Sequence, residues 1–510
     1  MHNRAISPYS LTRVALTSLR AMPCLLMVLA GCQMLPRVDN AHSPRQPPST
    51  SATGTTQQSS PTQSPKPPEA ASVPTATPSP RPMPGGLWFV FCRDAVNELE
   101  TEFIAFHLDS GTAHSSPLGD WSRCFDVYPS PIGDRLAYLA SPQRSAGTEI
   151  RILSLPSFTL EFEWQAHDQR TSAVEAQWSP DGRYLAYSVY GSDPPGELVT
   201  IDASSGVADT VAHSDGHIDS PTWSPTGDWL AFREARDYDP WTGPTDANVR
   251  VVSPSTGEDH ILIAGPQDAE IVLGPWTAEG ELLVMDRHIK SAPDQAGESF
   301  QFATNNLRAI HPQTAELQVL FAGEFDHVIT NPLTGTALVS SQPTDGSSGT
   351  AFYLTSSSLP SPRLVARTQG HASASWLPEA KAYAIVGNGS ALLVDVDGRT
   401  MNRLQVPGLA SVSPDAQLFL AYERPPSEDQ AVLLQIFNQE GTLIQGLETQ
   451  APYLVAWRPD SQGFIFTTAW GDVSYLQLGQ DVPLPIGWVF SEAGQGVIPF
   501  FIWSNHPADI

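Results

Sequence analysis

Residues 178–187 read WSPDGRYLAY, and residues 223–232 return to the same pattern as WSPTGDWLAF. Each copy has a Trp before Ser-Pro, a turn that contains Gly, and an apolar triplet after the turn. Pro presets φ, Asp can accept a hydrogen bond from the backbone two residues on, and Gly accepts a positive φ. The pattern therefore predicts two strands joined by a tight reversal, with the Trp at the end of the first strand. Weaker copies lie around Pro129, Val412 and Trp457, and degenerate ones around Trp276, Thr330 and Trp376.

The copies recur at a regular spacing. The eight positions equivalent to Trp178 are 129, 178, 223, 276, 330, 376, 412 and 457, on average about 47 residues apart. Apolar runs between them are strand-length, and no window carries a helical stripe of 3.6-residue period. A repeat of this length is typical of one four-stranded blade. We therefore predict an all-β chain that forms a β-propeller of four-stranded blades, eight in number, with seven and nine as the alternatives. Residues 87–117 and Gly496–Trp503 lie outside the eight copies, and we expect them to pair and close the ring.

The WSPDG-x-x-LAY element resembles the repeat of TolB-like propellers, a branch of the WD-repeat-like proteins. The resemblance covers residues 86–510 and implies the propeller fold. It implies no set of catalytic residues, because propellers carry enzymes, ligand binders and scaffolds alike. The chain departs from TolB itself in that residues 33–85 show no pattern of an N-terminal α/β domain.

Residues 1–31 predict a lipoprotein signal peptide. Three arginines and no acid come before the short apolar segment AMPCLLMVLA at residues 21–30. About ten apolar residues are too few to cross a bilayer core of roughly 30 Å. The segment ends in LAGC, which resembles the bacterial lipobox and implies lipidation of the Cys32 thiol. The alternative is an ordinary signal peptide with an incidental cysteine.

Residues 32–85 follow as the lipidated Cys32 and a predicted disordered tether. Thirteen prolines lie between residues 33 and 85, among Ser, Thr and Gln and with few aliphatic side chains. Such a composition buries too little apolar surface to offset the entropy of ordering the chain. The tether would carry the propeller, residues 86–510, away from a membrane.

The charge balance excludes one class of partner. The chain has 27 Lys and Arg against 54 Asp and Glu, a formal net charge of −27. A surface of this sign repels polyanions, so we predict no binding to nucleic acid.

Two cysteines lie in the folded part, Cys92 and Cys124, and we predict a disulfide between them. Export would place both in an oxidising compartment. Cys92 ends an early strand and Cys124 precedes the next inner strand, and in a propeller blade both positions lie near one face. The alternative is two separately buried thiols.

Other patterns suggest chemistry only weakly. His213, Asp215 and His217 could hold a metal, but no further ligand is assignable, so a solvated connection is favoured. The DVDG at residues 395–398 lacks the remaining ligands of a calcium loop and predicts a hairpin turn. The Gly-x-Ser-x-Gly of serine hydrolases does not occur. We predict no catalytic residue, no metal ligand and no cofactor.

The candidate partner-binding residues lie in the longest loop predicted to follow an LAY element, residues 233–248. Tyr238 and Trp241 are aromatic anchors on a stiff, Pro-containing loop, and Asp237 and Asp239 would favour a cationic or carbohydrate-bearing partner. Trp241 could instead fold back onto its own blade. By propeller geometry this loop shares one face with residues 140–149, 189–197, 287–298 and 423–430.

The leading hypothesis for function is a non-enzymatic binding or scaffold module. It would be anchored in a bacterial cell envelope through Cys32, with the propeller outside the cytoplasm on the periplasmic or cell-surface side, and would bind a protein or a carbohydrate. One alternative is a propeller enzyme that acts on a polysaccharide or a peptide. The other is a TolB-like component of an envelope complex.

Overall fold

The structure is a computed structural model. It describes residues 86–93, 102–117, 127–140, 149–165, 171–191, 196–235, 247–265, 270–291, 301–342, 348–387, 389–423, 430–450, 452–468, 471–488 and 501–506. These residues form antiparallel four-stranded sheets, which we call blades 1 to 9 in chain order. Among the described residues, no helix is long and apolar enough to cross a membrane.

Blade 3 shows how the repeat folds. Its strands are β8 (Thr171–Trp178), β9 (Tyr184–Gly191), β10 (Gly196–Asp202) and β11 (Ala208–Ser214). In the turn after β8, Ser179 Oγ accepts a hydrogen bond from the amide of Tyr184 (2.8 Å) and donates one to Asp181 Oδ1 (2.6 Å). Gly182 has φ of 69°, which a residue with a side chain rarely adopts. The Ser-Pro-Asp-Gly segment therefore forms the predicted reversal, and the Ser hydroxyl ties its two ends together.

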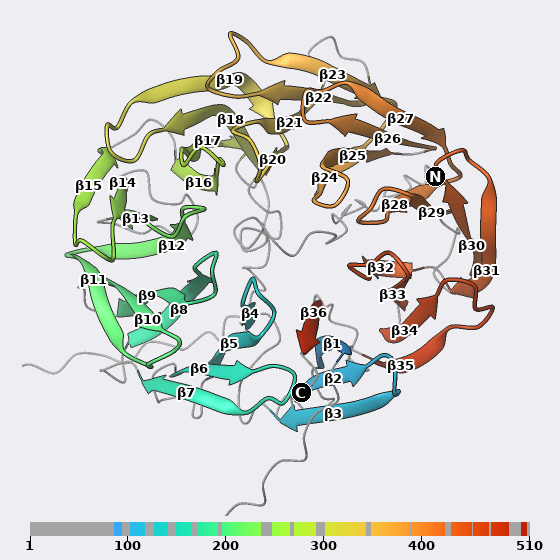
Figure 1. Ribbon diagram of the computed structural model, residues 1–510. Helices are drawn as coiled ribbons and strands as arrows, with labels where there is room; N and C mark the ends of the chain where they lie inside the picture. The colour runs from blue at the N-terminus through green and yellow to red at the C-terminus, as the bar shows by residue number, and fades with distance from the viewer. Residues whose placement is uncertain are drawn as a thin grey trace, which may run out of the picture. The chain divides into compact units, whose positions relative to one another are not determined.

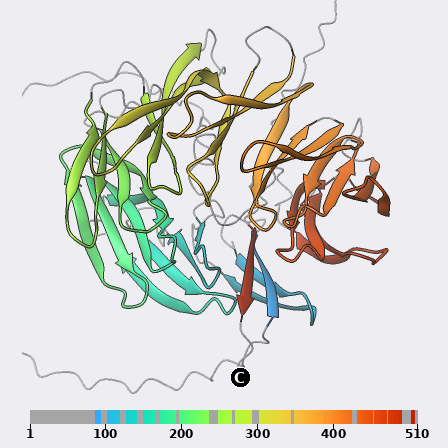
Figure 2. The same ribbon diagram turned by 45° about the horizontal axis from the view of Figure 1, so that its top comes forward.

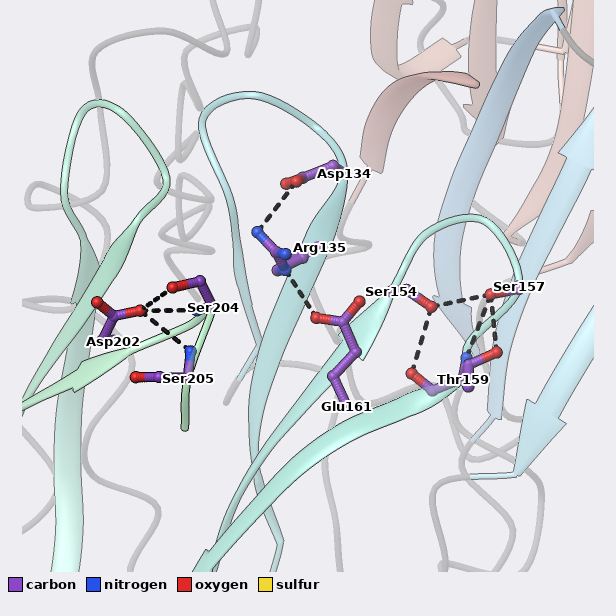
Figure 3. Close-up of polar contacts among 9 residues, drawn as sticks. All are labelled: Asp134, Arg135, Ser154, Ser157, Thr159, Glu161, Asp202, Ser204 and Ser205. Carbon is purple, nitrogen blue, oxygen red and sulfur yellow. Dashed lines mark hydrogen bonds and ion pairs between the residues drawn. The ribbon is translucent and has the colours of Figure 1, made fainter. Parts of the chain in front are cut away.

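The second hairpin of blade 3 reverses after Asp202. Asp202 Oδ1 accepts hydrogen bonds from the amide and hydroxyl of Ser204 (2.8 and 2.5 Å) and from the amide of Ser205 at 3.2 Å (Figure 3). In the neighbouring blade, Arg135 bridges Asp134 and Glu161. Short polar side chains thus close the turns, which leaves the apolar residues of the strands free to pack between blades.

The other blades follow the same plan. Blade 1 contains β1 (Gly86–Arg93), β2 (Glu102–His107), β3 (Thr112–Pro117) and β36 (Phe501–His506). Blade 2 contains β4 (Val127–Pro129), β5 (Arg135–Ala140), β6 (Glu149–Ser154) and β7 (Leu160–Gln165). Blade 4 contains β12 (His217–Trp223), β13 (Leu230–Ala235), β14 (Ala247–Val252) and β15 (Asp259–Ile263). Blade 5 contains β16 (Glu270–Trp276), β17 (Leu282–Ser291), β18 (Gln301–Ile310) and β19 (Leu317–Phe325).

The second half of the chain forms blades 6 to 9. Blade 6 contains β20 (His327–Thr330), β21 (Ala337–Ser341), β22 (Thr350–Thr355) and β23 (Arg363–Thr368). Blade 7 contains β24 (Ala372–Leu377), β25 (Ala382–Gly387), β26 (Ser390–Asp395) and β27 (Thr400–Gln405). Blade 8 contains β28 (Leu409–Val412), β29 (Leu418–Tyr422), β30 (Ala431–Asn438) and β31 (Leu443–Gln450). Blade 9 contains β32 (Pro452–Trp457), β33 (Gly463–Thr468), β34 (Asp472–Gln477) and β35 (Leu484–Trp488).

The apolar core lies between the blades. In the described part of the chain, buried apolar residues form nine clusters, and each cluster joins two consecutive blades. The first joins Trp88 of blade 1 to Leu136 of blade 2, and the series ends where Ile465 of blade 9 packs with Phe89 of blade 1. A series of contacts that returns to its first member is a closed ring. Figure 1 shows its first-in-blade strands, such as β8 and β12, toward the centre and β11 and β15 at the rim.

Strand β36 closes the ring. It pairs antiparallel with β1, with Leu87 opposite Asn505 and Phe91 opposite Phe501. Figure 2 shows this red C-terminal strand beside the blue β1. The sequence predicted the pairing of these two parts of the chain, and the structure confirms it.

The predicted number of eight blades is wrong, because the described residues form nine. All eight repeat positions mark true inner strands, including the doubtful one that ends at Thr330 in β20. Residues 86–117 and 501–506 together make a complete extra sheet, and its inner strand β36 does not carry the Trp-Ser-Pro pattern. A count of that pattern therefore misses one blade.

Candidate functional site

The predicted partner-binding residues Tyr238, Trp241, Asp237 and Asp239 lie outside the described residues, as do Cys32 and Cys124. The base of their loop is described. Ala235, the last residue of β13, pairs with Ala247, the first residue of β14. The loop therefore leaves and rejoins blade 4 at two neighbouring backbone positions, which confirms that it joins the second and third strands of the blade.

Polar contacts fasten this base. Asn248 donates a hydrogen bond to Glu234 Oε2 (3.1 Å) and accepts one from the amide of Gly265 (2.9 Å). Arg250 Nη1 lies 3.0 Å from Glu234 Oε1. Both ends of the loop are thus held by side chains of blade 4.

Cys92 lies on β1, is buried, and takes part in a disulfide. Because Cys124 lies outside the described residues, the pairing of Cys92 with Cys124 stays a prediction.

The other patterns noted in the sequence fall at turns and strand ends. His213 lies on β11, with Nδ1 3.6 Å from Glu197 Oε1, and His217 begins β12. Within the described ranges, no group of three or more His, Cys, Asp or Glu side chains is arranged to hold a metal ion. Asp395 closes the hairpin between β26 and β27, where its Oδ1 accepts a hydrogen bond from the amide of Arg399 at 2.7 Å.

Arg233, two residues before the end of β13, lies at the centre of an ion-pair cluster. Asp219 of β12 is its direct cross-strand neighbour. The guanidinium contacts both carboxylate oxygens of Asp219, with Nε to Oδ1 at 2.6 Å and Nη2 to Oδ2 at 2.9 Å. This two-point geometry is the strong form of an Arg–carboxylate pair.

The same guanidinium reaches blade 5. Arg233 Nη1 donates to Glu270 Oε1 at 2.9 Å and to the carbonyl of Ile271 at 3.0 Å. Glu270, on β16, is itself the cross-strand neighbour of Arg287 on β17 and accepts hydrogen bonds from it. Arg233 therefore ties blade 4 to blade 5 near the end of β13, the strand from which the 236–246 loop extends.

Burial makes this pairing electrostatically strong. Asp219 and Glu270 are 5% and 3% exposed. Burial alone would lower the pKa of Arg233, but the charges of Asp219 and Glu270 outweigh it and raise that pKa above its usual value. The guanidinium stays charged and holds both carboxylates in place.

Glu175, on β8, adds a third carboxylate from blade 3. Its Oε2 accepts a hydrogen bond from the amide of Ser220 at 2.5 Å. Burial raises the pKa of Glu175 to about 7; the charge of Asp219 adds to the rise, while Ser220 and Arg233 oppose it. Glu175 can therefore exchange a proton near neutral pH. We call Glu175, Asp219, Arg233, Glu270 and Arg287 the Arg233 cluster.

Sequence reasoning missed the Arg233 cluster. One signal was present: Arg233 stands where the preceding copy of the repeat has Ser188, so a charge replaces a small residue at an inward-facing position. Its partners were hidden, because Glu270 lies 37 residues further along the chain.

No family model matches the chain. A stretch of 59 residues is 36% identical to the uncharacterized protein Atu1656 of Agrobacterium fabrum, and the match covers 12% of this chain. The chain spans about a fifth of that relative, 20% of its length.

Solved structures with a similar arrangement share little sequence with the chain. A eukaryotic initiation factor is 13% identical with a TM-score of 0.49, over 82% of this chain and 96% of that chain. Dipeptidyl peptidase 4 of Porphyromonas gingivalis is 11% identical with a TM-score of 0.46, over 72% and 59%. TolB of Acinetobacter baumannii is 13% identical with a TM-score of 0.28, over 62% and 79%. The assignment of the β-propeller fold rests on the nine sheets themselves.

Proposed function

We propose that this protein is an extracytoplasmic lipoprotein, anchored through Cys32, whose propeller is a non-enzymatic module that binds a protein or a glycan. The LAGC motif and the Pro-rich residues 33–85 support the anchor and the tether. The closed ring supports the binding role, because a rigid scaffold holds the binding residues of its loops in defined positions.

The observation that carries this proposal is the pairing of Ala235 with Ala247 at the base of the 236–246 loop. A loop fastened at both ends loses less conformational entropy on binding than a free segment does. Tyr238 and Trp241 are the proposed anchors. Asp237 and Asp239 would select a partner that carries positive charge or hydroxyl groups.

The binding surface is tested by replacing Tyr238 and Trp241 together with Ala. We expect the melting temperature to stay nearly unchanged, because substitutions outside a packed core usually alter stability little. The native partner, recovered by cross-linking and pull-down with the unchanged protein, should no longer be recovered. The control is Ile261→Ala on β15, which removes an exposed apolar side chain (55% exposed) from the outer strand of the same blade. Unchanged partner recovery by the double variant, or a large loss of stability, would contradict the proposal.

The anchor is tested separately by membrane fractionation of a Cys32→Ser variant. We expect this variant to leave the membrane fraction, whereas Cys24→Ser stays in it. A Cys32→Ser protein that remains fully membrane-bound would refute the anchor.

A further inference from the structure

Strand β31 is the outer edge of blade 8. It pairs with β30 on one side, and on its other side it has no strand partner among the described residues. Figure 1 shows β31 at the rim of the ring. The pairing with β30 runs without a register shift from Gln445 to Gln450, which lie opposite Ile436 and Ala431. The backbone N–H and C=O groups on the free side therefore form a regular row that can pair with a further strand.

The other outer strands are less suited to such pairing. A register shift leaves at most three consecutive residue pairs in β11, β15, β19, β23 and β35. Strand β7 carries Glu161 and Glu163, and β27 carries Arg403. Strand β3 is as regular as β31, but it ends in Pro117 and has no exposed large apolar side chain. Charges, proline and bulges are the features that protect sheet edges from pairing, and β31 has only the single charge of Glu448.

An exposed apolar side chain lies beside this edge. Leu433 of β30 is 52% exposed. It lies on the same face of the blade as Gly446 of β31, and a methyl group at Gly446 would be 3.5 Å from Leu433 Cδ1. Because Gly446 has no side chain, Leu433 is uncovered on the side toward the free edge. A side chain opposite Gly446 on an added strand would cover Leu433.

The charge near the edge favours a basic neighbour for that apolar side chain. Glu448 is exposed and is the direct cross-strand neighbour of Leu433. Residues 430–450 contain Glu440 and Glu448 and no Lys, Arg or His. Gly446 and Glu448 share one face of the strand, so a basic side chain two residues from the apolar one would lie opposite Glu448. A second copy of this chain would bring the same acids and a formal net charge of −27, which disfavours it as the occupant.

The opposite face of β31 is fastened to blade 9. Gln445 Nε2 donates a hydrogen bond to the carbonyl of Gln480 (2.6 Å), and Gln445 Oε1 accepts one from the amide of Gly479 (3.1 Å). Leu447 is buried in the apolar cluster that joins blades 8 and 9. An incoming strand therefore meets an edge that is already held in place, which lowers the entropy lost on binding.

We infer that β31 is a docking edge for an extended segment of a basic partner protein, which adds to blade 8 as a further antiparallel strand. The partner's Lys or Arg lies opposite Glu448, and an apolar residue two positions later lies opposite Gly446 and covers Leu433. The docking segment thus reads basic-x-apolar. This edge belongs to blade 8, whereas the 236–246 loop belongs to blade 4, so the inference goes beyond the proposed function and does not depend on it.

The test measures the binding of fluorescently labelled peptides to the full chain by fluorescence anisotropy. The probe is the peptide TVTKTLTV, which carries Lys and Leu at the required spacing on one face of a strand. Its controls are TVTETLTV, in which Glu replaces the Lys, and TVTKTSTV, in which Ser replaces the Leu. We expect each control to bind about fivefold more weakly than the probe, because each lacks one favourable cross-strand pair.

The variant that blocks the edge is Gly446→Lys. A Cβ atom at this position meets Leu433 Cδ1 at 3.5 Å and the carbonyl of Leu434 at 3.9 Å, both ordinary contacts, so we expect the fold to persist. The new side chain covers Leu433 and repels the Lys of the probe, so binding should weaken about tenfold. The matched control is Gln405→Lys on β27, which adds the same charge to an exposed position on the outer strand of blade 7 and should leave binding unchanged.

Three results would overturn the inference: no binding of TVTKTLTV, equal binding of the probe and both controls, or equal binding of the probe by Gly446→Lys and the unchanged protein. If Gly446→Lys does not fold, Glu448→Gln takes its place and should remove the preference for the probe over TVTETLTV. Sedimentation equilibrium of the unchanged protein tests the other occupant. A dimer that Gly446→Lys or Glu448→Gln alters would show that the edge pairs with a second copy, and would contradict the basic partner.

Discussion

The indole Nε1 of Trp178 donates a hydrogen bond to the backbone carbonyl of Tyr128 at 2.8 Å, across the interface between blades 2 and 3. Tyr128 is the residue immediately before the repeat position of its own blade. The same relation recurs between Trp223 and Gln177 (3.1 Å) and between Trp276 and Thr222 (3.2 Å). The Trp of the repeat therefore fills the space between blades and also fixes the distance from one repeat to the next.

The first prediction concerns this bond. Trp178→Phe keeps an aromatic ring but removes the N–H, so we expect the free energy of unfolding to fall by about 1–3 kcal/mol for the lost hydrogen bond and the smaller ring. Urea denaturation followed by fluorescence and circular dichroism measures the change.

The control for this prediction is Trp376→Phe. Trp376 is buried in the equivalent place, yet its Nε1 has no hydrogen-bond partner among the described residues. Its replacement removes a similar volume and relieves an unpaired donor, so the loss should be smaller by about 1 kcal/mol or more. Equal losses in the two variants would show that the interblade hydrogen bond contributes nothing.

A second prediction concerns the Arg233 cluster. Arg233→Ala leaves Asp219 buried without its ion-pair partner and leaves Glu270 with Arg287 alone, which should cost about 3–5 kcal/mol. Arg183→Ala removes an ion pair with Asp202 whose arginine is 58% exposed, and should lower the stability far less because water and salt screen that pair. Thermal unfolding of the two variants side by side gives the comparison, and a similar melting temperature for both would be the contrary result.

A third prediction separates the stability lost through steric crowding from the stability lost through a left-handed backbone conformation, at two equivalent turns. Gly206 and Gly257 follow the third strand of blades 3 and 4, with φ of 70° and 73°. A methyl group at Gly206 would lie well inside van der Waals contact with the ring of Phe162 of blade 2, whereas one at Gly257 meets no atom within 4 Å.

Gly257→Ala should therefore lose about 1 kcal/mol, for the left-handed conformation alone. Gly206→Ala should lose a further 1–3 kcal/mol, roughly, because the ring of Phe162 must move. Denaturation midpoints of the two variants provide the measurement. Equal midpoints would mean that the ring of Phe162 can move aside without a loss of stability.

A fourth prediction concerns β36. A protein that ends at residue 500 lacks the partner of β1 and the ring contact between Phe89 and Trp503. The open edge of β1 should then pair with other molecules, so we expect self-association in light scattering and a lower unfolding midpoint. A protein that ends at residue 506 keeps β36 and should remain like the full chain. A stable monomer that ends at residue 500 would show that closure does not need this strand.

The sequence predicted the part of the fold that local chemistry determines. Pro180, Asp181 and Gly182 each have a conformational preference that fits one turn, and Trp178 marks the strand end before it. The ninth blade could not be counted, because its inner strand and its other strands lie at opposite ends of the folded part. The sequence predicted that this segment pairs with residues 87–117, but nothing in it marked β36 as the inner strand of a further blade.

The Arg233 cluster was not predicted from the sequence for a related reason. Asp219 and Arg233 become neighbours through strand register, and the bulge at Ser220 shifts that register by one residue. Bulges leave no clear mark in a sequence without Gly, so the side on which Asp219 points was not predictable. That Cys92 takes part in a disulfide agrees with the sequence, whereas its pairing with Cys124 and the binding role of the loop around Trp241 stay predictions.

The pairing of β1 with β36 also limits the order in which the blades can form. About 400 residues separate the two strands, and by the scaling of loop closure the entropy lost in bringing such distant segments together corresponds to roughly 5 kcal/mol. The eight sheets built from consecutive strands have short connections and can form while the chain is still emerging, whereas the first three strands must wait for the last one. For that interval the molecule is an open arc with one unfinished blade, and the edge of β1 stays unpaired until β36 has been made.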